Sequence, residues 1–556
     1  MSQGQCPKEA IWPVALHFRF LTGVGAANTL GTGDSHMKSP QFRCATFVFI
    51  GLCVLLGIPT LCMASNHYVC HGATGAGTGA DWNNAYTGFG AGPGQINPGS
   101  MVRGDTYYVA AGTVSSLNST LGFSVPDSGT SVITIQAATD ANPGTATGWT
   151  SGGTGACHQG QATFGPIQTT TDYWTFNGVY NDLMTAPSNN KSSYGFYFNN
   201  GAGTGTPVNS TAAIYVEGTA NNVIIKYVDV EGSGNTTSTA IGDKAIWVNS
   251  YPVSGGNNDY VGYSHLHDAS VYMLQFGGGD SDVAEYNWME RNCCNGGAAH
   301  RGAIDLGVNT LSSGSSEAVS NLTIRYNMVE DIDGTSWIDT AEGTIYTFTA
   351  SNWYIYGNVF QCNTAENTGS NACAGGNGVI EFLGDPNLSP FPTYSNINIL
   401  NNTVSGLIAA NGQCGVGLNS GTYNNLTVRN NIFHSCSSNQ PLCGQNGATC
   451  TGTTTLDSNS FYNVSGGSGW GTNAQVATGN PFANGGTNAA GANDFQLASD
   501  TSAWSVLSNI TMGQVTETLT IDLDQNTRTS SRGAYQFQGS SASSPNPPKG
   551  LTAVVN

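Results

Sequence analysis

The 556-residue sequence is poor in charged side chains, and basic ones are especially scarce. Charged residues make up 9% of the chain, against about 25% in an ordinary soluble domain. Lys and Arg together number 15 against 34 Asp and Glu, which gives a formal net charge of −19. Such a chain has no basic surface to neutralise a phosphate backbone. We therefore expect no nucleic-acid partner.

The sequence also lacks the Cys and His spacing of a zinc site, because no CxxC pair with His ligands occurs among its 14 Cys. Disulfides are the expected alternative, since an even number of Cys follows residue 64 in what we expect to be an exported chain. Close spacing favours pairing of Cys362 with Cys373 and of Cys443 with Cys450. Spacing alone leaves the remaining connectivity open.

Only one segment, Cys44–Cys62, is hydrophobic enough to insert into a membrane. Basic residues precede it, Pro59 interrupts it, and small residues follow at Ala64, which is the pattern of a secretory signal peptide. We expect residues 37–64 to be that signal and the remainder to be secreted, either to the periplasm or outside the cell, without stable membrane insertion. A transmembrane anchor is the alternative, because the segment is nearly long enough to span a bilayer. Residues 1–36 are expected to be a mis-assigned extension.

The chain is rich in Gly, with 75 residues. A short sequence phrase also recurs along its length. Within each copy, apolar and polar residues alternate, which is the two-residue period of a strand with one buried face. Recurrence of one strand at intervals is typical of a repeat architecture. The clearest copies are NLTIRYNMV from Asn321, NWYIYGNVF from Asn352, NINILNNTV from Asn396 and NLTVRNNIF from Asn425, and weaker copies begin at Asp172, Asn222, Asp259 and Ser281.

The seventh position of the phrase is Asn in six consecutive copies. Parallel strands stacked in register would place these side chains above one another, where amides both donate and accept hydrogen bonds. We therefore predict an asparagine ladder. His265 occupies the seventh position of the copy from Asp259, and we expect it to be a packed substitute for Asn. The six ladder residues are Asn287, Asn327, Asn358, Asn402, Asn431 and Asn459.

A second strand phrase precedes most copies, so each repeat supplies at least two strands to a β-solenoid. From about Tyr68 to Gln538 the sequence resembles the right-handed parallel β-helix proteins of the pectate-lyase-like group, and its opening YVCHGATGAGTGADWNNAY and close IDLDQNTRTSSRGAYQF resemble the ends of such proteins. The resemblance implies an all-β, right-handed parallel β-helix over residues 65–538, monomeric if its ends are capped. Residues 539–556 are a Ser/Pro-rich tail. No catalytic signature of one enzyme family is present.

The second phrase contains two alternating rows of side chains. Asp305 and Glu381 fall in the outward row two turns apart, or about 10 Å between backbones. An inverting glycoside hydrolase holds its acid and base roughly 6.5–9.5 Å apart, so this pair suits hydrolysis; a pair of merely solvated carboxylates is the alternative. The core row is predicted to be Ile214, Ile246, Tyr272, Ile304, Ile345 and Ile380, and the outward row Tyr215, Trp247, Met273, Asp305, Tyr346 and Glu381.

Further candidates precede these strands. His300 and Arg301 come before Asp305, and Lys244 comes before Trp247, so that all three would lie beside one groove. The predicted catalytic residues are therefore Asp305, Glu381, His300, Arg301 and Lys244. Aromatic rings offer flat apolar faces for sugars, and the predicted substrate-binding residues are Trp247, Tyr346 and Tyr215.

The stretch VEDIDGTSWIDTAEG is rich in carboxylates and contains a D-x-D-G turn that resembles those of calcium loops. We predict a calcium site there, although acidic loops are commonly only solvated. Its ligands would be Asp331, Asp333, Asp339 and Glu342.

These observations predict a secreted protein that binds a polysaccharide and cleaves it in a groove on one solenoid face. Elimination needs a base and a cation to neutralise a uronate carboxylate, and the resemblance favours it. The pair Asp305 and Glu381 and the acidic composition favour hydrolysis of a neutral glycan. A noncatalytic adhesin or structural solenoid at the cell surface is the rival prediction, because fold does not fix function.

Overall fold

The computed structural model separates into two units, Met1–Cys62 and Met63–Asn556. It describes residues 64–179, 188–202, 204, 206–218, 220–234, 243–249, 257–292, 302–307, 316–332, 337–340, 347–362, 378–382, 392–406, 414–437, 443–444, 447–465, 469–483, 495, 497, 510–512, 515–517, 522–524 and 532–535. Residues 37–63 of the proposed signal segment and the C-terminal tail lie outside these residues. Within them, no helix has the length and apolarity needed to cross a bilayer.

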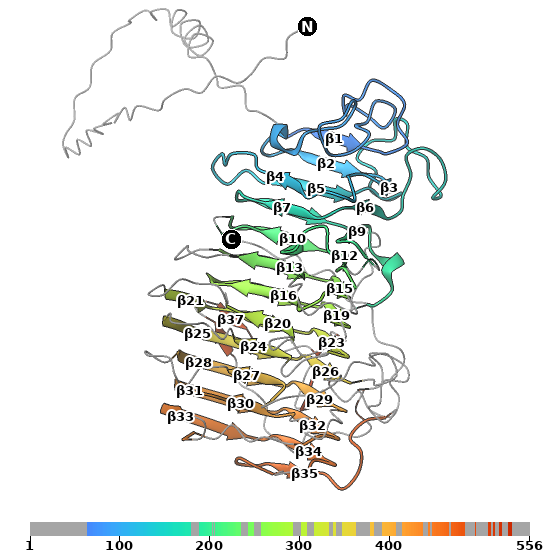
Figure 1. Cartoon of the computed structure of the whole chain (residues 1–556). Coiled ribbons are helices and arrows are strands. Elements are labelled where there is room, and N and C mark those ends of the chain that lie inside the picture. Colours follow the sequence, from blue (N-terminus) through green and yellow to red (C-terminus); the bar gives the residue numbers. More distant parts are fainter. Residues whose placement is uncertain are drawn as a thin grey trace, which may run out of the picture. The chain divides into compact units, whose positions relative to one another are not determined.

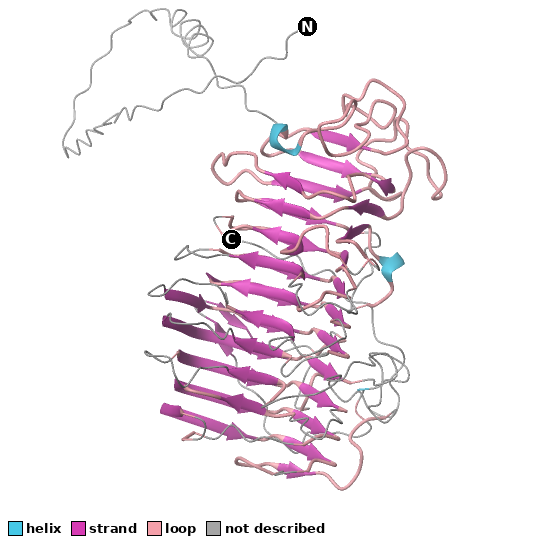
Figure 2. Ribbon diagram, viewed as in Figure 1, coloured by secondary structure: helices cyan, strands magenta, loops and turns pink. Residues whose placement is uncertain are grey.

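The described chain is a parallel β-helix built from three long sheets (Figures 1 and 2). Each strand pairs in parallel with the equivalent strands of the preceding and following turns, as the repeated phrases predicted. In the part of the chain that the structure describes, the helical elements are two short 3-10 turns, η1 (Pro98–Ser100) and η2 (Lys191–Ser193). The fold prediction is thus confirmed.

The recurrent first phrase forms the fourteen-stranded sheet, and its final residues form the twelve-stranded sheet. The fourteen-stranded sheet contains β1 (Asn66–Val69), β2 (Thr106–Val109), β5 (Ile133–Ala137), β8 (Trp174–Asn177), β11 (Ile224–Lys226), β14 (Tyr260–Gly262), β17 (Gly279–Asp280), β18 (Val283–Glu285), β21 (Ser316–Ser320), β22 (Thr323–Arg325), β25 (Thr347–Tyr356), β28 (Thr393–Leu400), β31 (Gly421–Arg429) and β33 (Ala448–Asp457). The twelve-stranded sheet contains β3 (Gly112–Thr113), β6 (Ala162–Phe164), β9 (Phe196–Asn199), β12 (Val228–Glu231), β15 (His265–His267), β19 (Trp288–Glu290), β23 (Met328–Glu330), β26 (Val359–Gln361), β29 (Thr403–Ser405), β32 (Ile432–His434), β34 (Ser460–Tyr462) and β35 (Gln475–Val476).

The second phrase forms the nine-stranded sheet. Its strands are β4 (Leu121–Phe123), β7 (Ile167–Thr169), β10 (Ala212–Val216), β13 (Lys244–Asn249), β16 (Tyr272–Gly277), β20 (Gly302–Leu306), β24 (Ile338–Thr340), β27 (Ile380–Phe382) and β30 (Val416–Leu418). A separate antiparallel pair joins β36 (Ile510–Met512) to β37 (Val515–Glu517).

Strand register in the nine-stranded sheet corrects the predicted core row in two turns. Leu274, not Tyr272, aligns with Ile246 and Ile304. Ile338 aligns with Ile304 and Ile380. The strand of this turn therefore comes from the segment WID (337–339) and not from the predicted segment TIYTF (344–348). Ile345 lies outside the described residues. Both sequences contain alternating apolar residues, and only the pairing with neighbouring turns distinguishes them.

The asparagine ladder is present as predicted. The Nδ2 of Asn358 donates to the Oδ1 of Asn402 at 2.9 Å, and the Oδ1 of Asn358 accepts from the Nδ2 of Asn327 at 3.0 Å. The same pattern continues to Asn431 and Asn459. Every rung is almost completely buried, so these bonds satisfy polar groups that water cannot reach.

The rung below Asn287 is a serine, which corrects the prediction for His265. The backbone N–H of Ser264 donates to the Oδ1 of Asn287 at 3.1 Å. His265 aligns with Trp288, one residue beyond the ladder. The copy begins at Asn258, whose φ of 50° matches the left-handed first residue of the copies at Asn321 and Asn352, and not at Asp259.

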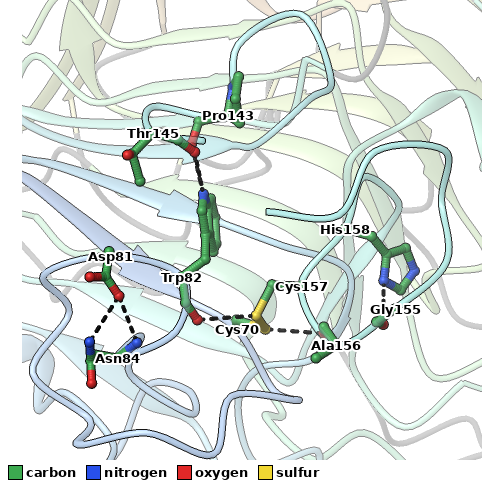
Figure 3. The surroundings of a disulfide bond; sticks show 10 residues. All are labelled: Cys70, Asp81, Trp82, Asn84, Pro143, Thr145, Gly155, Ala156, Cys157 and His158. Carbon is green, nitrogen blue, oxygen red and sulfur yellow. Dashed lines mark hydrogen bonds between the residues drawn. A yellow bond between two sulfur atoms is a disulfide. The ribbon is translucent and has the colours of Figure 1, made fainter. Parts of the chain in front are cut away.

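The N-terminal turn is closed by a disulfide between Cys70 and Cys157 (Figure 3). Beside it, the indole Nε1 of Trp82 donates to the carbonyl oxygens of Pro143 and Thr145, both at 3.0 Å. Cys70, Cys157 and Trp82 belong to a small apolar cluster separate from the main core.

Two further disulfides join Cys414 to Cys436 and Cys443 to Cys450. The second confirms the pairing predicted from spacing. Cys362 is also disulfide-bonded, while Cys373 lies outside the described residues. These bonds fit an oxidising compartment.

Candidate functional site

The predicted outward row lies on the nine-stranded sheet, and register defines its members. Asp305 aligns with Asp339, and Asp339 aligns with Glu381. Three carboxylates therefore occupy three successive turns, with the core residues on either side of them pointing inward. On the other side of Asp305 the row continues through Gln275, Trp247 and Tyr215.

Two members of the predicted row are corrected. Gln275 holds the place expected for Met273, which is a core residue. Asp339 holds the place expected for Tyr346, and Tyr346 lies outside the described residues. The spacing of two turns between Asp305 and Glu381 is as predicted.

The carboxylates of the row are covered, although they point away from the core. Asp305, Asp339 and Glu381 are 0%, 1% and 3% exposed. The amide of Gln275 donates to Asp305, and that of Asn419 donates to the Oε1 of Glu381 at 2.9 Å. The expectation of freely solvated carboxylates is therefore wrong, because polar side chains and the surrounding chain enclose them.

Burial has a direct electrostatic consequence for Asp305. It removes the ionised carboxylate from water and, together with the neighbouring Asp339 carboxylate, raises the pKa of Asp305 well above its usual range. The nearby Lys244 ammonium offsets this only in part. Burial and Asp339 thus both favour the protonated form of Asp305, in which it can donate a proton or a hydrogen bond.

The aromatic end of the row is more accessible than its carboxylates. Tyr215 and Trp247 are both half-buried, and their ring centroids lie 5.1 Å apart with planes tilted by 37°. The Nζ of Lys244 lies 4.3 Å from the centroid of a Trp247 ring. Burial lowers the pKa of Lys244, and the Asp305 and Asp243 carboxylates partly restore it.

The remaining predicted site residues are only partly described. His300, Arg301, Asp333 and Glu342 lie outside the described residues. Of the two described calcium ligands, Asp339 lies in the nine-stranded sheet and Asp331 directly follows β23 of the twelve-stranded sheet. The structure therefore assigns these two carboxylates to different sheets.

A second cluster of titratable groups, which the sequence analysis missed, lies on the twelve-stranded sheet. His265 and His267 alternate with Leu266, so both rings face away from the core. Asp229 aligns with His265, and its Oδ1 lies 2.7 Å from the Nδ1 of His265 and 3.2 Å from the Nε2 of His267. The signal in the sequence was the HLHD tetrapeptide, whose two-residue period places both histidines on one face.

This histidine cluster carries an extensive ion-pair network. Burial lowers the pKa of His267, but hydrogen bonds to Asp229 and Asp268 outweigh burial and raise it to about 9. The guanidinium of Arg291 contacts Asp268 and Glu290.

Comparison with known proteins identifies fold relatives only. No family model matches the chain, and no curated protein matches it. The chain is similar to the crystal structure of pectate lyase Pel9A, at 12% identity with a TM-score of 0.37, over 85% of this chain and 97% of that one.

Two other solved structures are also similar. The alginate lyase AlyGC of family PL6 is 11% identical with a TM-score of 0.33, over 69% of this chain and 52% of that one. The catalytic unit of a GH87 alpha-1,3-glucanase from Streptomyces thermodiastaticus is 11% identical with a TM-score of 0.23, over 68% of this chain and 61% of that one. These likenesses concern the β-helix, and they assign no substrate or catalytic residue.

Proposed function

We propose that this protein is a secreted polysaccharide-active enzyme that hydrolyses a glycan at the row formed by Tyr215, Trp247, Asp305, Asp339 and Glu381. The observation that carries the proposal is the alignment of three carboxylates in successive turns, in which burial and Asp339 raise the pKa of Asp305. Inverting hydrolysis requires one protonated and one ionised carboxyl group on opposite sides of the bond.

The roles follow from the surroundings of each group. Protonated Asp305 would donate its proton to the departing glycosidic oxygen. Glu381, whose ionised form is stabilised by the hydrogen bond from Asn419, would accept a proton from the attacking water. Asp339 lies between them in register and would maintain the high proton affinity of Asp305.

Substrate binding would use the accessible end of the row. Tyr215 and Trp247 present neighbouring rings, and apolar ring faces stack on sugars. The formal net charge of −19 favours a neutral glycan over a polyuronate, because like charges repel. Since the carboxylates are buried, catalysis requires the side chains that cover them to move when the sugar binds.

Elimination is a second candidate, supported by Lys244. Its pKa is lowered by burial, which favours the neutral amine that a base for the C5 proton of a uronate requires. Two of the similar structures are those of a pectate lyase and an alginate lyase. A noncatalytic solenoid is the remaining alternative, and the complete burial of Asp305 is compatible with a purely structural polar row.

The test is incubation of the purified protein with neutral and acidic polysaccharides, followed by measurement of reducing ends and of unsaturated-uronate absorbance. Hydrolysis predicts reducing ends without absorbance, and a loss of about 100-fold or more in rate for Asp305→Asn and Glu381→Gln. Asp457→Asn is the matched control, because Asp457 is a partly buried carboxylate on the fourteen-stranded sheet, paired with Arg429. New absorbance that depends on Lys244 would establish the lyase instead, and absence of both signals would support the noncatalytic solenoid.

A further inference from the structure

We propose that Asp229, His265 and His267 form a binding site for a first-row divalent transition metal, with zinc as the representative ion. One carboxylate oxygen and one ring nitrogen from each histidine lie within 4.8 Å of one another. All three side chains are 0% exposed. The proposal is independent of the hydrolytic row, which lies on another sheet.

The two histidines converge on a single acceptor. The Nδ1 of His265 and the Nε2 of His267 both face the Oδ1 of Asp229, and the two rings stack with centroids 4.3 Å apart. A cation bound between them would bring the two ring nitrogens and the Asp229 carboxylate into one coordination sphere.

The opposite nitrogen of each ring is already held by another carboxylate. The Nε2 of His265 lies 3.1 Å from Glu290, and the Nδ1 of His267 lies 2.6 Å from Asp268. Metal-binding histidines commonly donate their second N–H to a carboxylate, which fixes the tautomer and increases ligand basicity. Both rings of this cluster are therefore oriented as metal ligands would be.

An unsatisfied oxygen lies at the same place. The Oδ2 of Asp229 is buried and has no hydrogen-bond partner among the described residues. A buried carboxylate oxygen without a partner is costly, and a metal ion bound by both oxygens of Asp229 would satisfy it. Glu231, whose Oε2 lies 3.9 Å from the Nε2 of His267, is the nearest candidate for a fourth ligand.

Local charge is compatible with a divalent ion. Four carboxylates in the cluster face two permanent cations, which leaves a deficit of two positive charges that one divalent ion would supply. The carboxylates are Asp229, Glu231, Asp268 and Glu290, and the cations are Lys191 and Arg291.

The donor set determines the class of metal. Imidazole nitrogen combined with carboxylate oxygen suits zinc and its first-row neighbours, whereas calcium prefers a set made only of oxygens. Because all three side chains are fully buried, we expect the metal ion to be incorporated while the protein folds. The histidine site is therefore distinct in its ligands from the predicted calcium site, whose ligands would all be carboxylates.

The test uses protein purified from zinc-supplemented cultures, without chelator, with metal content measured by mass spectrometry. We expect about one zinc per chain, the stoichiometry of a single structural site. His267→Gln should lose that zinc, and Glu290→Gln should weaken binding by about 10- to 100-fold. The matched control is His434→Gln, which removes a buried histidine from the same outward row of the same sheet and should retain zinc.

Cobalt substitution provides a measurement that does not depend on a variant folding correctly. Protein prepared with Co²⁺ in place of zinc should show the visible absorption of a four-coordinate centre with nitrogen and oxygen ligands. Wild-type protein that contains no tightly bound zinc or cobalt would overturn the proposal, as would zinc retained in full by a folded His267→Gln variant. Binding of calcium but not of zinc would also overturn it.

Discussion

The asparagine ladder allows a quantitative prediction for the substitution Asn358→Ala. Asn358 is completely buried and makes four side-chain hydrogen bonds. It donates to the carbonyl of Ile324 and to Asn402, and it accepts from the backbone and the side chain of Asn327. Its φ is not positive, so alanine introduces no backbone strain.

The magnitude follows from the groups that lose their partners. Truncation leaves the backbone N–H of Asn327 and one N–H of its side chain unpaired in a dry environment, and it removes one hydrogen bond from the carbonyl of Ile324. Asn402 keeps one donor, the backbone N–H of residue 358. At about 1–3 kcal/mol for each buried unsatisfied group, we expect a loss of about 3–5 kcal/mol.

The assay is urea unfolding followed by circular dichroism, with Asn396→Gly as the control. Asn396 also belongs to a stack of amides, because it donates to Asn352 and accepts from Asn425. It is exposed and has a φ of 56°, so water replaces its partners and glycine tolerates its backbone. We expect this variant to lose only about 1 kcal/mol.

Equal losses in the free energy of unfolding for Asn358→Ala and Asn396→Gly, at equal m-values, would refute the role assigned to burial. An unfolding intermediate that appears only in Asn358→Ala would support the role of the ladder. Because each turn of a solenoid contacts only its neighbours, an interrupted ladder uncouples the turns on either side.

Two further predictions concern pH and the first turn. Burial lowers the pKa of His434 to about 4 from 6.5, so the unfolded chain binds the proton first as pH falls. The contribution of His434 to stability should therefore be constant above pH 6.5 and decrease by up to about 3 kcal/mol towards pH 4. Urea unfolding of His434→Gln across this range should show a smaller acid loss, and an unchanged loss would contradict the assignment. Replacing Cys70 and Cys157 by Ser should destabilise the protein by about 2–4 kcal/mol, measured by thermal unfolding, whereas the Cys443–Cys450 loop, with a separation of 7 residues, should contribute less; equal losses would contradict the loop-length argument.

Much of the architecture was present in local sequence patterns. Alternation of apolar and polar residues identified the strands, and the recurrence of Asn at one position identified the stack. The Cys443–Cys450 pair followed from spacing. These features depend on residues close in sequence or on a strict repeat, so no long-range information was needed.

The content of the outward row was predicted less completely. Asp305 and Glu381 were correctly separated by two turns, yet Asp339 was assigned to a loop and not to the row. The HLHD segment was shifted by one residue, which placed His265 at the ladder and concealed its proximity to Asp229. A shift of one residue exchanges the inward and outward faces of a strand, so small errors of alignment have large effects on a site.

The sequence by itself determined the strand periodicity, the ladder and the parallel β-helix, because each depends on a repeat that stacks on itself. Only the tertiary structure decided which side chains meet across turns, that the carboxylates of the row are buried, and that two histidines share one aspartate. Those properties depend on pairing between strands far apart in sequence, such as the 36 residues between Asp229 and His265, and on what covers the outer faces. The spacing of insertions within the repeat specifies neither.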